Sequence, residues 1–203
     1  MNKRYKIIVV VVFILALIVA GFFYYNKAQE DKMGPVSFES FKRIEADGKV
    51  FMENKDIGLK FEVPDGWKVD NAGWSTISLI SDNFVPFKED MANAPLANVG
   101  CWIDITAEKE QKTENYINNT YNFIKELKSY PKDGVSIINV GGYDSLKTVS
   151  SIGGENQVGE NVYIETPNNN IIYTFQLSYL KNNTSDCLNI FNKFLDSASI
   201  TNK

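Results

Sequence analysis

Hydrophobic and polar residues alternate in several short segments of the chain, and this spacing places one set on each face of a β-strand. In LKFEV (residues 59–63) the three apolar residues share one face, and the lysine and glutamate share the other. Residues 75–81 (STISLIS) and 98–106 (NVGCWIDIT) predict two further strands. In the last of these, the residues expected on the apolar face are Val99, Cys101, Ile103 and Ile105.

The first strand leads into Pro64, Asp65, Gly66 and Trp67. Proline presets φ at the second position of a β-turn, and glycine accepts the backbone that closes it, so we predict a β-turn over residues 63–66. Residues from Trp67 onward then form the return strand, with Trp67 in the core. This interpretation gives the turn an architectural role rather than a ligand-binding one.

Apolar residues recur at three- and four-residue spacing in two segments, which predicts amphipathic helices. The first runs from about residue 113 to residue 129, with Thr113 as its cap and Glu114 in its first turn. The second runs from about residue 185 to residue 197. The apolar residues are Ile117, Tyr121, Ile124 and Leu127 in the first helix, and Leu188, Phe191, Phe194 and Leu195 in the second.

Four strand-like runs lie between the two helices, at residues 135–140, 143–152, 161–166 and 171–180. Glycine pairs and the sequence PNNN separate them as turns. The order of strands, helix, meander and closing helix predicts an α+β domain. Its expected architecture is an antiparallel β-sheet with helices packed on its faces.

The N-terminal residues 1–25 predict a transmembrane anchor. Ile7 to Tyr25 contains 19 residues without a charge, and as a helix this run spans roughly 28 Å, close to the thickness of a bilayer core. Lys3, Arg4 and Lys6 precede it and should stay cytoplasmic. The alternative is a cleaved signal peptide, which would leave a secreted protein. Both interpretations place the rest of the chain outside the cytoplasm.

Residues 26–49 are mostly polar and contain the break Gly34-Pro35, so we predict a linker with a short helical turn near residues 38–44. The folded domain is then expected over residues 50–203.

The composition excludes several kinds of function. The chain has 203 residues and no histidine, which removes the commonest general base and the commonest metal ligand. Four of its 21 basic residues lie in the first 27 residues, which contain no acid, so the remainder carries 17 basic and 25 acidic residues, a net charge of −8. An acidic body without a basic patch argues against a nucleic-acid partner. We expect no catalytic residue, no metal and no cofactor.

The acidic residues show no calcium-binding spacing. Asp104, Glu108 and Glu110 cluster near a strand end, and Glu155 and Glu160 flank a hairpin turn. Neither group has the spacing of an EF-hand loop. We therefore interpret them as solvated surface acids.

The order of elements resembles the PsbP-like superfamily, which includes an extrinsic photosystem II subunit, a Ran-binding import factor and bacterial exported proteins. The similarity lies in FEVPDGWKV, the mid-chain helix, and the meander of VGGYDSLKTVSS, NVYIET and NNIIYTFQLSY with its terminal helix. It covers about residues 50–200. The resemblance implies a noncatalytic domain that docks onto larger assemblies. Metal association in photosystem relatives relies partly on histidine, so the resemblance brings no metal site here.

Cys101 and Cys187 are both expected on buried faces, of a strand and of the last helix. Outside the cytoplasm they could form a disulfide. The sequence favours the alternative of two buried free thiols, because spacing along the chain cannot show proximity. Neither cysteine is expected to be a nucleophile, since no histidine is present to activate it.

Residues 82–98 (DNFVPFKEDMANAPLAN) form a long irregular connection of the kind that often carries function. Exposed apolar residues there would form a docking patch. In the alternative, they fold back and cover the end of the sheet. The candidate docking residues are Phe84, Phe87, Met91 and Leu96.

We therefore expect a noncatalytic, membrane-anchored extracytoplasmic domain that binds another cell-envelope protein or assembly. The alternative is a small-molecule or lipid-binding module that uses the concave side of the sheet beside residues 82–98. A flat apolar patch would favour a protein partner, whereas an aromatic-lined cavity of several hundred cubic ångströms would favour a small ligand. A cluster of facing acids with shifted pKa values would indicate an enzyme.

Overall fold

The computed structural model describes residues 17–21, 24, 34–86, 97–109, 115–126, 134–151, 157–166, 170–180 and 184–201. The chain falls into two units, Met1–Gly34 and Pro35–Lys203. Residues 17–21 are helical, but most of the predicted anchor over residues 1–25 lies outside the described residues. Within the described part of the chain, no helix combines the length and apolar character needed to cross a membrane.

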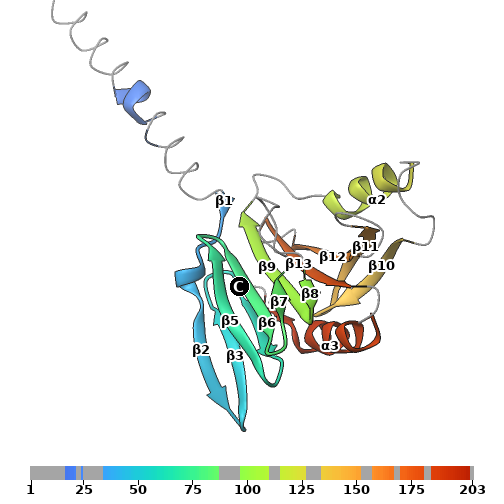
Figure 1. The fold of residues 1–203 in the computed structure, drawn as a ribbon. Helices are drawn as coiled ribbons and strands as arrows, with labels where there is room; N and C mark the ends of the chain where they lie inside the picture. Colours follow the sequence, from blue (N-terminus) through green and yellow to red (C-terminus); the bar gives the residue numbers. More distant parts are fainter. Residues whose placement is uncertain are drawn as a thin grey trace, which may run out of the picture. The chain divides into compact units, whose positions relative to one another are not determined.

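The second unit is built mainly from antiparallel strands in one large and one small sheet (Figure 1). Neighbouring strands from β10 to β5 pair antiparallel in the large sheet, and the predicted meander is confirmed as β10 to β13. β1 (Gly34–Pro35) also pairs with β9. The strands of the large sheet, in spatial order, are β10 (Val135–Val140), β11 (Tyr143–Ser151), β12 (Gln157–Thr166), β13 (Ile171–Leu180), β9 (Cys101–Lys109), β6 (Thr76–Ser81) and β5 (Trp67–Gly73).

The small sheet combines strands from both ends of the second unit. Its order is β14 (Ser199–Ile200), β4 (Leu59–Val63), β3 (Lys49–Asn54) and β2 (Lys42–Ala46). After β14, the Thr201 N–H donates to the Gly58 carbonyl at 2.9 Å. A side chain at Gly58 would collide with the Thr201 backbone, and Gly58 has a φ of +72°, so this junction requires glycine.

The predicted linker over residues 26–49 is wrong from residue 35 onward. A single turn of 3-10 helix (Phe38–Ser40) is followed by the β2–β3 hairpin, and the domain begins at Pro35. Ala46 pairs with Lys49 across a two-residue turn, in which Asp47 and Gly48 both have positive φ, 53° and 74°. Asp-Gly is a strong signal for such a hairpin turn, and it was present in the sequence.

The turn after β4 is a corner between the two sheets. The Trp67 N–H donates to the Pro64 carbonyl at 3.0 Å, so the turn spans residues 64–67 rather than 63–66, and Gly66 adopts a φ of +74°. Residues 64–67 are called the corner turn below. The strand after the turn was predicted to return beside β4. This pairing is wrong, because β5 pairs with β6 in the large sheet. Alternation identifies a strand but not the strand beside it.

Helix α3 (Thr184–Ser197) packs between the two sheets and completes the main core. The ring of Phe194 meets Phe61 of β4 at 5.5 Å and Phe175 of β13 at 5.3 Å, both edge to face. All three rings are fully or almost fully buried. One helical side chain therefore joins both sheets, and the predicted second helix is confirmed.

Helix α2 (Tyr116–Glu126) covers the other face of the large sheet. It forms a small cluster with Leu146 of β11, while the neighbouring Ser145 pairs with Ile164 of the main core. Because successive residues of a strand point to opposite faces, α2 and α3 lie on opposite sides of the sheet. The predicted class, α+β with helices on an antiparallel sheet, is confirmed. The ends of the predicted helix 113–129 lie outside the described residues.

Candidate functional site

Phe84, the first candidate docking residue, packs against the large sheet. Its half-buried ring meets Trp102 of β9 edge to face at 5.2 Å, and its N–H donates to the Ser81 carbonyl at 2.9 Å. For Phe84, this placement agrees with the alternative in which the segment folds back onto the sheet. The other candidate docking residues lie outside the described residues: Phe87, Met91 and Leu96.

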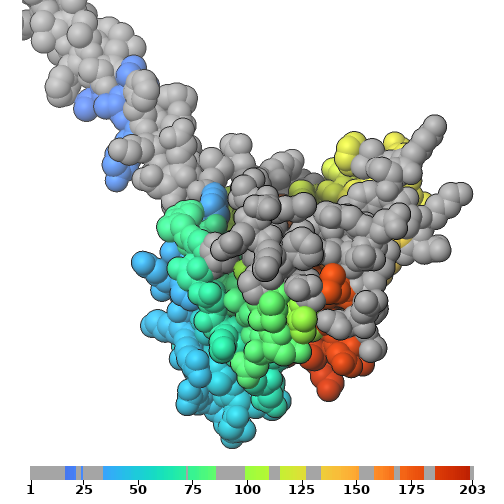
Figure 2. Space-filling view, viewed as in Figure 1, coloured from blue at the N-terminus to red at the C-terminus, as the bar shows by residue number. Residues whose placement is uncertain are grey.

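A short hairpin base forms where the two ends of that segment meet. β7 (Val85–Pro86) pairs with β8 (Ala97–Val99). In Figure 2, the green part of the chain, which ends at β7, lies on the surface. Val85 and Val99 face each other and remain 47% and 41% exposed. Val99 was expected on the buried face, but Gly100, with a φ of +84°, interrupts the alternation before β9 begins.

The face of the large sheet that carries Trp102 is polar. Paired positions on five adjacent strands, β6, β9, β13, β12 and β11, form one row across it. The outer two residues of the row are buried and the middle three are half-buried. The hydroxyl of Thr148 is buried and has no hydrogen-bond partner among the described residues. This polar row consists of Ser78, Asp104, Gln176, Asn161 and Thr148.

Asp104 is the acidic residue of the polar row. Its carboxylate accepts hydrogen bonds from the Ser78 hydroxyl and from the Trp102 indole N–H. Burial raises the pKa of Asp104, and the two hydrogen bonds act in the opposite direction. The net shift is upward, so desolvation outweighs the two donors.

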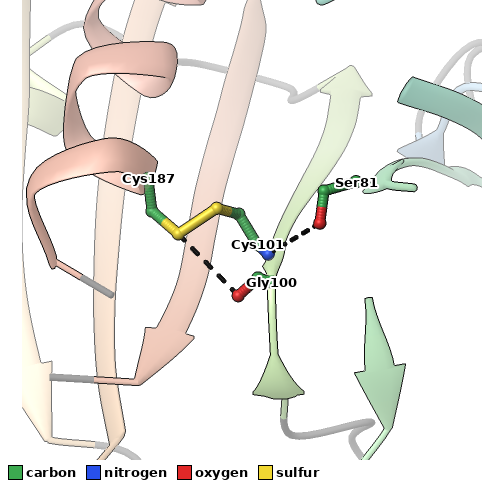
Figure 3. Close-up of a disulfide and its surroundings, with 4 residues drawn as sticks. All are labelled: Ser81, Gly100, Cys101 and Cys187. Carbon is green, nitrogen blue, oxygen red and sulfur yellow. Dashed lines mark hydrogen bonds between the residues drawn. A yellow bond between two sulfur atoms is a disulfide. The ribbon is translucent and has the colours of Figure 1, made fainter. Parts of the chain in front are cut away.

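Cys101 and Cys187 form a disulfide between β9 and α3, with an S–S distance of 2.01 Å (Figure 3). The favoured interpretation of two free thiols is therefore wrong, although both residues are buried as expected. The Cys101 N–H donates to the Ser81 hydroxyl at 3.0 Å, and the Cys187 sulfur lies 3.7 Å from the Gly100 carbonyl oxygen. The topology places helix and strand in contact, which the spacing of 86 residues could not show.

The remaining acidic candidates do not converge. Glu108 is exposed, and Glu110 and Glu155 lie outside the described residues. Within the described ranges, no group of three or more cysteine, aspartate or glutamate residues is arranged to hold a metal ion.

Glu160 was expected to be a solvated surface acid, but it is buried. The Lys147 ammonium lies 2.6 Å from one of its carboxylate oxygens, and the Tyr179 hydroxyl donates to the other at 3.4 Å. Burial, together with the charge of Glu160, raises the pKa of Tyr179 to about 12. An ion pair at this depth explains how the charge is tolerated in the fold.

A cleft of about 390 Å³ opens where α3 meets the corner turn. Trp67, predicted to lie in the core, is half-buried and contributes one wall. This turn was expected to be purely architectural, because a turn motif carries no sign of what packs near it. We call this space the corner cleft; its lining residues are Lys49, Glu62, Pro64, Asp65, Trp67, Ile190, Lys193, Phe194 and Ser197.

Charges of both signs surround the apolar floor of the corner cleft. The Lys49 ammonium lies 2.8 Å from the Glu62 carboxylate, and this hydrogen bond raises the pKa of Lys49, with a smaller contribution from the charge of Asp65. Lys193 projects from α3 and has no ion-pair partner among the described residues.

Comparison with known proteins concerns the fold. No protein-family model and no curated protein sequence matches this chain. A protein of Bacteroides thetaiotaomicron is similar over 72% of this chain and 46% of its own length, with 11% identity and a TM-score of 0.50. The chain thus spans less than half of that protein.

Two further structures have lower scores. LpqN of Mycobacterium tuberculosis, a protein involved in cell envelope biogenesis, has a TM-score of 0.48 and 15% identity, over 80% of this chain and 91% of LpqN. The Saccharomyces cerevisiae Ran-binding protein Mog1p has a TM-score of 0.38 and 10% identity, over 79% of this chain and 95% of Mog1p. At such identities, similarity concerns the architecture alone.

Proposed function

We propose that the chain is a noncatalytic PsbP-like domain of the bacterial cell envelope that binds another envelope protein. In this proposal, residues 1–25 anchor it in the cell membrane and the folded unit lies outside the cytoplasm. The uncharged run of 19 residues after three basic residues supports the anchor. The disulfide supports the location, because such bonds persist mainly in oxidising compartments.

The exposed Val85–Val99 pair at the base of the β7–β8 hairpin carries the proposal of a protein partner. Two facing β-branched residues that are 47% and 41% exposed form an apolar surface that folding leaves uncovered. Phe84, held against Trp102, fixes this base on the sheet. Apolar residues held on a rigid base resemble the centre of a protein interface.

A second candidate is a small-molecule-binding module, and the polar row favours it. Half-buried Asp104, Gln176 and Asn161 offer donors and acceptors on one face, close to the hairpin base. Buried polar groups are stable only when hydrogen-bonded, and a polar ligand could provide those bonds. The row is too polar for a lipid chain.

Site-specific photo-crosslinking in cells tests the protein partner. A photoreactive residue replaces Val85, Val99 or Met91 in turn, and the matched control position is Asn139, which is exposed on the edge strand β10. We expect one discrete adduct from the hairpin positions and none from Asn139. Val85→Asp combined with Val99→Asp should remove the Met91 adduct without changing the thermal unfolding of the domain.

Two results would overturn the docking proposal. One is the absence of any adduct from a folded, membrane-associated protein. The other is an identical adduct from Asn139, which would show only general proximity to an abundant protein.

A further inference from the structure

The corner cleft has a floor that is rigid before any ligand arrives. Phe194 is 2% exposed and is held between Phe61 and Phe175, while the position of Trp67 is fixed by the hydrogen bond that closes the corner turn. Ile190, on the same side of α3, adds an aliphatic surface. A preformed apolar floor binds an apolar group without a large ordering cost.

The walls of the cleft differ in charge. Lys49 is paired with Glu62 and is also affected by the charge of Asp65, so these two acids and one base leave a net charge of −1. The C-terminal half of α3 contributes Lys193. The lining of the cleft around Trp67 therefore combines a net negative group with the positive charge of Lys193.

This arrangement selects against ligands with a single charge. An anion that approaches Lys193 also meets the net negative wall, and a cation that approaches Asp65 also meets Lys193. A neutral apolar ligand would reduce the solvation of both charges without replacing it, which is unfavourable. A ligand with one positive group, one negative group and an apolar body can pair with the charges of both signs and can bury its apolar body against the floor.

We propose that the corner cleft binds a zwitterionic apolar ligand, namely a short apolar peptide or a free amino acid with an apolar side chain. The ammonium lies toward Asp65 and Glu62, the carboxylate toward Lys193, and the apolar side chain on Trp67. A volume of about 390 Å³ lies in the lower part of the range of small-ligand sites, which suits a ligand of this size. The site is separate from the β7–β8 hairpin, since Trp67 and Trp102 occupy opposite faces of the large sheet.

The three tryptophans of the chain provide reporters in three different places. Trp67 lines the corner cleft, Trp102 contacts Phe84 below the hairpin, and Trp74 is exposed in the β5–β6 turn. In the full-length protein in lipid nanodiscs, indole ¹⁵N labelling gives one NMR signal for each. We expect leucyl-leucine to shift the Trp67 signal and to leave the Trp74 and Trp102 signals unchanged.

Modified probes test the charge requirement. N-acetylated leucyl-leucine and leucyl-leucine amide each lack one charge, and each should bind about fivefold more weakly, the loss expected for a partly exposed ion pair of up to about 1 kcal/mol. Free leucine and leucyl-tyrosine, titrated in parallel, distinguish an amino-acid site from a peptide site. Both compounds belong to the proposed class of zwitterionic apolar ligands, so binding of either one supports the proposal.

Reversing the charge of Lys193 tests whether the carboxylate end of the ligand lies beside this residue. Lys193→Glu should weaken binding of leucyl-leucine about fivefold and should strengthen binding of its amide, because the cationic amide no longer meets the positive charge of Lys193. Lys68→Glu is the matched control, because Lys68 follows Trp67 directly but points to the opposite face of β5. Both residues are exposed, so neither substitution should unfold the domain.

Three outcomes would overturn the proposal. They are a constant Trp67 signal with leucine and both peptides, equal affinity for free and capped peptides, and equal effects of Lys193→Glu and Lys68→Glu. None of them depends on the crosslinking result at the hairpin.

Discussion

The two faces of the large sheet are built from the same strands but have opposite chemistry. On the side of α3, Ile77, Ile105, Phe175 and Val162 lie in one row of paired positions, and all four are buried. The adjacent residue on each of these strands points to the other side of the sheet, where the polar row lies near the hairpin base and α2. The face toward α3 therefore builds the core, whereas the opposite face keeps a polar surface across the middle of the sheet.

The helices on the two faces are held differently. Helix α3 joins both sheets through Phe194 and is tied to β9 by the disulfide. Among its described residues, helix α2 contributes Ile117 and Ile124 to a small buried cluster with Leu146, and Tyr116 and Tyr121 pack against that cluster. Stability within a domain varies between such regions, so we expect α2 to open locally and α3 only with the whole fold.

The largest expected effect comes from removing the covalent link on the apolar face. Replacing both Cys101 and Cys187 by alanine should lower the free energy of unfolding by about 4–5 kcal/mol, the entropic value for a closed loop of this length. Urea unfolding of the oxidised parent and the variant measures it. The variant should not respond to reducing agent, and a difference below about 1 kcal/mol would show that α3 is held by packing alone.

A smaller effect is expected where α2 meets the sheet. The Ile117 N–H, in the first turn of α2, donates to the buried carboxylate of Glu165 at 3.0 Å. Glu165→Ala leaves this donor unpaired and should cost about 1–2 kcal/mol. Hydrogen exchange should accelerate in α2 more than in α3, with the exposed Glu108→Ala as control. Equal acceleration in both helices would contradict the separation of the two faces.

The smallest effect concerns pH and the polar row. Because the pKa of Asp104 is raised in the folded protein, the native state holds its proton more tightly than the unfolded chain, where an aspartate titrates near 3.9. Its contribution to stability is therefore fully present below the unfolded pKa and is lost as pH rises through the folded pKa.

Asp104→Asn keeps an acceptor for Ser78 and Trp102 but cannot ionise. The melting temperature of the variant should therefore rise relative to that of the parent as pH increases from about 3 to 7. Asp70→Asn, at an exposed site on the same face, should show no such trend. A constant difference between variant and parent would show that Asp104 titrates as it does in the unfolded chain.

Local patterns predicted much of the fold. The alternation in residues 171–180 and the stripe through Phe191 and Phe194 depend on neighbouring residues, and both elements are present as expected. The turn at Gly141-Gly142 likewise joins paired strands, with Val140 opposite Tyr143. These elements are specified by interactions within a few residues of sequence.

The remaining features depend on contacts between distant residues. Alternation marked residues 59–63 as a strand, but only tertiary packing assigns β4 and β5 to different sheets. The disulfide and the corner cleft likewise join α3 to segments much earlier in the chain. The β2–β3 hairpin is a different case, since Asp47-Gly48 was a local signal that the polar composition of the segment concealed.

The pairing of β14 with β4 has a consequence for the order of events during synthesis. Until Ser199 to Thr201 have emerged from the ribosome, β4 lacks one neighbour, and until α3 has emerged, Phe61 lacks the ring of Phe194. Domains generally fold as units, so we expect the second unit to close only once α3 and β14 are available to β4. The core shared by the two sheets is therefore completed only after α3 and β14 have been synthesised.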